Sequence, residues 1–123
     1  MAVIGTLIAE SLRPGAVLED VLLLVHKIAR DDIGDVDAGQ PRTWTFLDFE
    51  AANEDADQLA AALEQALSPV GGWYCDFRND AETFVVYSAR TFRYPRRDVS
   101  GRMRAAAHGR NAGVPEAQLD WPE

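Results

Sequence analysis

Residues 42–67, "RTWTFLDFEAANEDADQLAAALEQAL", place a strand directly before a helix. The first part, 42–50, is rich in aromatic and β-branched side chains, which predicts a β-strand. The second part, 53–67, begins with acidic residues, which the positive end of a helix dipole favours. It then repeats apolar residues at helical spacing, which predicts a long amphipathic helix. The apolar face of this helix comprises Ala56, Leu59, Ala60, Leu63, Ala66 and Leu67.

The predicted strand is apolar on both of its faces. Trp44 and Phe46 fall on one side, and Leu47 and Phe49 fall on the other. Strands of this kind are covered on both faces. We expect the second cover to come from the terminal helices or from another subunit.

Three further strands are expected after the helix. The runs 73–77 and 83–89 flank a turn and predict a β-hairpin, and 91–94 extends it by a third strand.

The C-terminal part of the chain predicts a second helix. It covers 98–110, with Asp98 or Ser100 as its N-cap. One helical turn is expected after Pro115, because proline is favoured at the first position of a helix. Trp121 is expected to be anchored on the body of the protein.

The N-terminal part is harder to interpret. Apolar residues at helical spacing predict a helix over 3–12, ended by Arg-Pro-Gly at 13–15. Residues 17–30 fit either a helical stripe or a buried strand, and we favour a strand over 21–30. The acidic segment 30–41 is expected to be a turn-rich loop.

These elements follow the order α-β-β-α-β-β-β-α. A long helix between groups of strands predicts an α+β fold. We expect a two-layer sandwich with a mainly antiparallel sheet of about five strands, a long central helix and terminal helices. The length of 123 residues fits a single α+β domain over residues 1–123.

The charge of the chain is uneven. The formal net charge is −8, and residues 1–57 hold twelve acidic and four basic side chains, whereas residues 90–110 hold seven arginines and one acid. The single cysteine fits a reducing cytoplasm. The N-terminus has no positive region typical of a signal peptide. No apolar run approaches the length of a membrane span, so we expect a cytoplasmic protein without membrane contact.

Three stretches carry a resemblance to a known family: "GQPRTWTFLDFE", "GGWYCDFRNDAETFVVYSARTFRYPR" and "GVPEAQLDWPE". They resemble an uncharacterised family of small acidic proteins from GC-rich Gram-positive bacteria, and the similarity runs over most of the chain. The resemblance implies a bacterial, cytoplasmic, single-domain protein. It implies no catalytic residue, ligand or partner.

The sequence contains no pattern typical of a catalytic or metal site. Alternation puts Cys75 on one face of its strand with Trp73 and Phe77, and Asp76 on the other, so Cys75 is expected to be buried and inert. His26 and His108 have no second ligand at helical spacing. The acidic loop that holds Asp31, Asp32, Asp35 and Asp37 does not fit an EF-hand, because glycine falls at the fifth position and Phe46 at the twelfth. We expect no cofactor and no metal.

The arginine-rich segment 90–110 offers the candidate contacts for a partner or an anion: Arg93, Arg97, Arg102 and Arg104. One interpretation is that these arginines neutralise the acidic first half of the same chain. Another is that they contact a protein or a phosphate-type ligand. Nucleic acid is the least favoured ligand, because the overall negative charge opposes approach to phosphate.

The sequence therefore favours a non-catalytic protein-interaction domain, with an immunity-type or accessory role as one form. The expected partner is another protein or a second copy of the chain, and complementary charged surfaces would give specificity and fast association. The alternative is a small enzyme or binder of an anionic ligand that uses the arginine segment.

Overall fold

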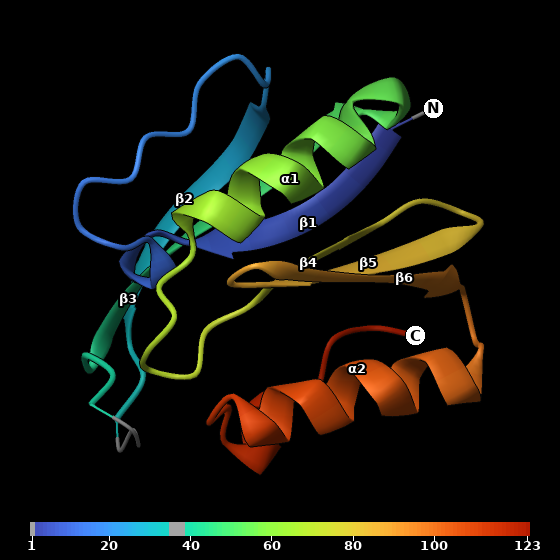
Figure 1. The fold of residues 1–123 in the computed structure, drawn as a ribbon. Coiled ribbons are helices and arrows are strands. Elements are labelled where there is room, and N and C mark those ends of the chain that lie inside the picture. Colours follow the sequence, from blue (N-terminus) through green and yellow to red (C-terminus); the bar gives the residue numbers. More distant parts are fainter. Residues whose placement is uncertain (1, 35–38) are drawn as a thin grey trace.

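A six-stranded antiparallel sheet forms the centre of the protein (Figure 1). The computed structural model describes residues 2–34 and 39–123. The strands lie across the sheet in the order β2-β3-β1-β4-β5-β6. Their bounds are β1 (Ala2–Ile8), β2 (Leu24–Asp32), β3 (Thr43–Ala52), β4 (Cys75–Arg78), β5 (Glu82–Tyr87) and β6 (Arg90–Pro95). The predicted α+β class with an antiparallel sheet is confirmed, with six strands where about five were expected.

Two helices lie on opposite faces of this sheet (Figure 1). Helix α1 (Ala56–Ala66) follows β3, and α2 (Val99–Asn111) follows β6, as the sequence predicted. Alternation along β5 separates the two cores. Phe84 and Val86 pack with the apolar face of α1, whereas Val85 packs with Ala105 of α2.

The predicted helix at 3–12 is wrong, because this segment forms β1 and then a short 3-10 turn, Ala9–Ser11. Val3 and Leu7 are both buried in the core beneath α1. A separation of four residues keeps two side chains on one face of a helix and also on one face of a strand. The spacing therefore fits both structures, and pairing of β1 with β3 and β4 decides between them.

The ambiguous segment 17–30 contains a strand, as favoured from the sequence. Strand β2 begins at Leu24, later than expected, and runs to Asp32. The residues before it form a loop whose Leu18, Val21 and Leu23 pack against the core beneath α1.

Helical cover differs between the two halves of the sheet. Helix α2 and the C-terminal tail pack against β5 and β6, so this half has three layers. In the described chain, β1 and β3 have a helix only on the α1 side, and β2 contributes no residue to the core beneath α1, so the predicted two-layer arrangement applies to β1 and β3 alone. The expected terminal helices do not cover the second face of β3, because the N-terminal segment forms β1 and α2 packs against β5 and β6. Trp44 packs there against Trp73, and Phe46 stays half-buried.

The C-terminal tail is held on the body as predicted. It forms the 3-10 turn Glu116–Gln118, and the buried Trp121 donates its indole N–H to the hydroxyl of Tyr94 at 2.7 Å. Neither helix of the described residues combines the length and apolar character that crossing a membrane requires.

Candidate functional site

A groove of about 520 Å³ lies on the sheet face opposite α1. Residues of β1, β2, β3 and β4 form its floor, and the segments 72–74 and 117–120 form its wall. We call it the sheet groove. Its volume falls within the usual range of binding pockets, about 300–1,000 Å³.

Four polar side chains form a row across the floor of the sheet groove. Lys27 on β2 lies opposite Asp48 on β3, Asp48 lies opposite Thr6 on β1, and Thr6 lies opposite Asp76 on β4. Paired residues of neighbouring antiparallel strands share a face of the sheet. Thr6 Oγ1 donates a hydrogen bond to Asp48 Oδ1 at 2.8 Å. The sheet thus gathers residues that are far apart in the sequence.

Aromatic side chains form the other part of the sheet groove. Trp44 and Phe46 come from β3, and Trp73 and Tyr74 come from the segment before β4. The rings of Trp44 and Trp73 lie 5.1 Å apart between centroids. The expectation that Trp73 shares the core face of Cys75 is wrong. Trp73 precedes the strand, so strand alternation does not determine the direction of its side chain.

The wall at 117–120 is held by polar contacts. Gln40 and Gln118 exchange two side-chain hydrogen bonds, of 3.1 and 2.9 Å, and Gln40 Nε2 also donates to the carbonyl of Gly71 at 2.7 Å. The hydroxyl of Tyr74 donates to the carbonyl of Gln118. These contacts fix the tail against the loop before β3, so the groove has a preformed wall.

The charge of the sheet groove is mainly negative. Asp31, Asp48, Asp76 and Asp120 line it, with Lys27 as the single lysine or arginine among its lining residues. Burial raises the pKa of Asp76 from 3.8 to about 6, and the neighbouring charge of Asp120 adds to this shift. The positive charge of Arg78 opposes the shift only in part. The groove therefore holds a carboxylate that water solvates poorly.

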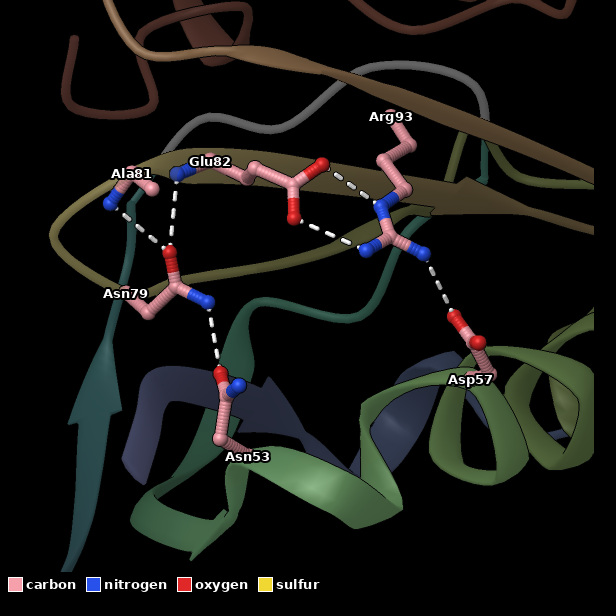
Figure 2. A network of polar contacts seen from close by, with 6 residues as sticks. All are labelled: Asn53, Asp57, Asn79, Ala81, Glu82 and Arg93. Carbon is pink, nitrogen blue, oxygen red and sulfur yellow. Dashed lines mark hydrogen bonds and ion pairs between the residues drawn. The ribbon is translucent and has the colours of Figure 1, made fainter. Parts of the chain in front are cut away.

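Arg93, the first of the predicted contact residues, is bonded within the protein (Figure 2). Its Nε and Nη2 donate to the carboxylate of Glu82 at 2.6 and 2.8 Å, and Nη1 donates to Asp57 Oδ1 at 2.8 Å. Asp57 lies in the acidic first half of the chain, so this contact agrees with internal neutralisation. Figure 2 also shows Asn79, which accepts hydrogen bonds from the backbone N–H groups of the β4–β5 turn and donates one to Asn53.

The other three predicted arginines lie outside the sheet groove. Arg97 and Arg102 line a smaller hollow of about 220 Å³ beside Asp98. The guanidinium of Arg102 also lies 4.7 Å from the centre of the Trp121 ring. Arg104 is exposed on α2. The structure thus brings Arg97 and Arg102 together and leaves Arg93 and Arg104 apart from them.

Cys75 is buried, as predicted, with 1% of its surface exposed. Its pKa is raised, first by burial and then by the charge of Asp76. Its side chain belongs to the core beneath α1, on the sheet face opposite the groove.

The two histidines also lie outside the sheet groove. His26 Nε2 pairs with Glu50 Oε1 at 2.7 Å on the exposed surface. His108 lies against the rings of Tyr87 and Phe92. Its pKa is lowered by burial and by the charge of Arg90, so His108 is neutral near pH 7.

The acidic segment predicted to be a solvated loop is described only in part. Asp31 and Asp32 end β2, while Asp35 and Asp37 lie outside the described residues. Across 2–34 and 39–123, no three His, Cys, Asp or Glu side chains are grouped so that they could hold a metal ion.

Sequence reasoning did not identify the sheet groove. Alternation correctly put Asp76 on the strand face opposite Cys75, but nothing local connects Asp76 with Asp48 or Lys27. Thr6 was missed because its segment was assigned to a helix.

Comparison of the chain with protein-family models, with curated proteins and with solved structures finds no match in any of the three.

Proposed function

We propose that this chain is a non-catalytic protein-interaction domain that binds a basic segment of its partner in the sheet groove. The observation that carries the proposal is the combination of aromatic rings and carboxylates on a sheet face without helical cover. Concave sites lined by aromatic side chains and a few polar groups are typical of binding sites.

The chemistry of the groove suits an arginine or lysine side chain. Trp44, Phe46 and Trp73 line the groove, and aromatic rings can attract a cation. Asp48 and Asp76 supply carboxylates, which form strong charge-assisted hydrogen bonds with guanidinium and ammonium groups. A cation placed beside Asp76 would also compensate the carboxylate that burial leaves poorly solvated.

The placement of the reactive side chains supports binding over catalysis. The thiol of Cys75 is in the core, and both histidines lie outside the groove. The hydroxyl of Thr6 donates to Asp48, but a hydroxyl nucleophile is usually activated by a histidine or an amine.

A matched pair of short peptides tests the proposal. One is a blocked tripeptide with a central arginine, and the other carries citrulline, which has nearly the same shape without the charge. We expect the arginine peptide to shift the indole NMR signals of Trp44 and Trp73, and the citrulline peptide to bind more weakly. Equal binding of both peptides, or no shift with either, would contradict the proposal.

Two variants and one control locate the binding. Asp48→Asn and Asp76→Asn each remove a groove carboxylate, and each should weaken binding of the arginine peptide about tenfold or more. Asp80→Asn removes the same charge from the exposed β4–β5 turn and should leave binding unchanged. The same three variants can be used to capture a partner from native host extract. A partner held in the groove should be lost with Asp48→Asn and Asp76→Asn and kept with Asp80→Asn, whereas a partner held elsewhere should be kept with all three.

A further inference from the structure

Strand β2 is an edge of the sheet and is open to solvent. It stands at one end of the strand order, and eight of its nine residues are exposed. An edge strand offers unpaired backbone N–H and C=O groups to another strand. A strand of nine residues is longer than usual, since strands are most often about five or six residues long.

Exposed apolar side chains are concentrated on and just before this edge. Of the nine large hydrophobic residues exposed in the described chain, five lie between residues 17 and 28. These five are Val17, Leu22, Leu24, Val25 and Ile28. None lies on β6, which forms the opposite edge and ends in Pro95. The two edges therefore differ, and β2 is the one suited to pairing.

We propose that two copies of this chain associate through β2, as antiparallel neighbours related by a two-fold axis through Ala29. Regular pairing of β2 begins at Lys27, because the register shifts between Val25 and Lys27. The regular stretch runs from Lys27 to Asp32, and Ala29 lies within it. In a two-fold interface each contact occurs twice.

Charge decides the position of the axis. An axis through Lys27, Arg30 or Asp31 would put that residue opposite its own copy, and like charges directly opposite are destabilising. An axis through Ile28 would put Lys27 opposite Ala29, without an ion pair. An axis through Ala29 puts Lys27 opposite Asp31 of the second copy, and this ion pair forms twice.

The same register also covers apolar surface. It puts Ile28, which is 67% exposed, opposite Arg30 of the second copy. The aliphatic stem of an arginine can cover an apolar neighbour while its charged end stays in water. The two Ile28 side chains become diagonal neighbours across the axis.

A charged residue in an edge strand often prevents pairing. Lys27 alone would have that effect on β2. Asp31, at the same distance on the other side of Ala29, makes the strand complementary to itself. Lys27, Ala29 and Asp31 also line the sheet groove, so pairing would bring the two grooves side by side on one continuous sheet face.

Charge reversal combined with analytical ultracentrifugation tests the pairing. The unmodified chain should sediment as a concentration-dependent dimer at low salt. Lys27→Asp or Asp31→Lys alone turns both ion pairs into repulsions and should raise the dimer dissociation constant about tenfold or more. The double variant restores opposite charges and should recover the dimer.

Controls separate this interface from the rest of the surface. Arg104→Asp makes the same charge change as Lys27→Asp at an exposed position of α2 and should leave the dimer unchanged. A monomer at all concentrations, or two single variants that dimerise normally, would overturn the proposal. A double variant that stays monomeric while folded by circular dichroism would overturn the Ala29 register. Asp48→Asn should leave the dimer intact, so groove binding and dimer formation can fail independently.

Discussion

At the scale of single residues, Asp76 is a carboxyl group whose charged form is disfavoured by its burial in the folded protein. Its pKa is raised from 3.8 to about 6, chiefly because burial disfavours its charged form. The folded protein therefore holds this proton more tightly than the unfolded chain does. It follows that stability decreases as the pH rises from about 4 to about 6, and the full penalty remains at higher pH.

We predict that Asp76→Asn stabilises the protein at neutral pH, because the variant removes a poorly solvated charge. The melting temperature should increase by several degrees at pH 7 and hardly change at about pH 3 or below, where the carboxyl is mostly protonated in both states. Thermal unfolding followed by circular dichroism at both values measures this. Asp80→Asn is the control, because Asp80 is exposed. An equal gain at both pH values would show that charge burial is not the cause.

Gly5 on β1 lies opposite Phe77 on β4, at a point where the two strands leave little room for a side chain. A Cβ atom at this position would lie 2.4 Å from the carbonyl oxygen of Asp76 and 2.7 Å from Cβ of Phe77. Both are atoms of the neighbouring strand β4, which cannot move aside without disturbing the pairing.

We predict that Gly5→Ala destabilises the protein by about 1–3 kcal/mol, the usual range for inserting a methyl group into a filled site. Urea unfolding measures the change. Gly15→Ala is a useful comparison, because its Cβ would meet no atom within 4 Å, although its φ of +88° adds strain that is unrelated to crowding. If Gly5→Ala unfolds at the same urea concentration as the unmodified chain, β1 and β4 are less closely packed than described.

At the scale of elements, α1 covers the core that it forms with β1, β3, β4 and β5. Leu59 and Leu63 from this helix are buried among side chains of β1, β3 and β5. The structure confirms the sequence-based expectation that Leu63 is fully buried, with 1% of its surface exposed.

Leu63→Ala is therefore expected to destabilise the protein by about 2–5 kcal/mol, through lost apolar burial and the cavity that remains. The midpoint of denaturant unfolding measures the effect. Leu22→Ala makes the same change at a position that is 85% exposed and should have little effect. Similar shifts for the two variants would mean that α1 contributes little to the core.

At the scale of the whole molecule, two arginines of the segment 90–110 are paired with acidic side chains. Arg93 is neutralised by Glu82 and Asp57, and Arg110 pairs with Glu116. With a net charge of −8, the protein repels phosphate at long range.

We predict that the protein does not bind nucleic acid. A gel-shift titration with single-stranded and duplex oligonucleotides at about 50 mM salt, where arginine–phosphate contacts are strong, should show no complex at micromolar protein. A salt-sensitive shift that Arg93→Ala together with Arg97→Ala abolishes would show that the arginine segment binds phosphate after all.

Local physics made several features of this protein predictable from the sequence. The aromatic and β-branched residues of 42–50 and the hairpin pattern that includes 83–89 identified strands, and the apolar face at 56–67 identified α1. The burial of Cys75 followed from the strand face that it shares with Phe77. These conclusions needed no knowledge of which segments meet in space.

Only the tertiary structure decided where β1 lies and what surrounds the sheet groove. The apolar spacing of 3–12 fits a helix and a strand equally, and contacts with β3 and β4 choose the strand. Lys27, Asp48, Thr6 and Asp76 come from four separate strands, so their meeting depends on strand order and register. In the described chain, no helix covers the part of the sheet face that holds the groove, because α2 packs against β5 and β6 instead. Such contacts join residues far apart in the chain, and no local pattern contains that information.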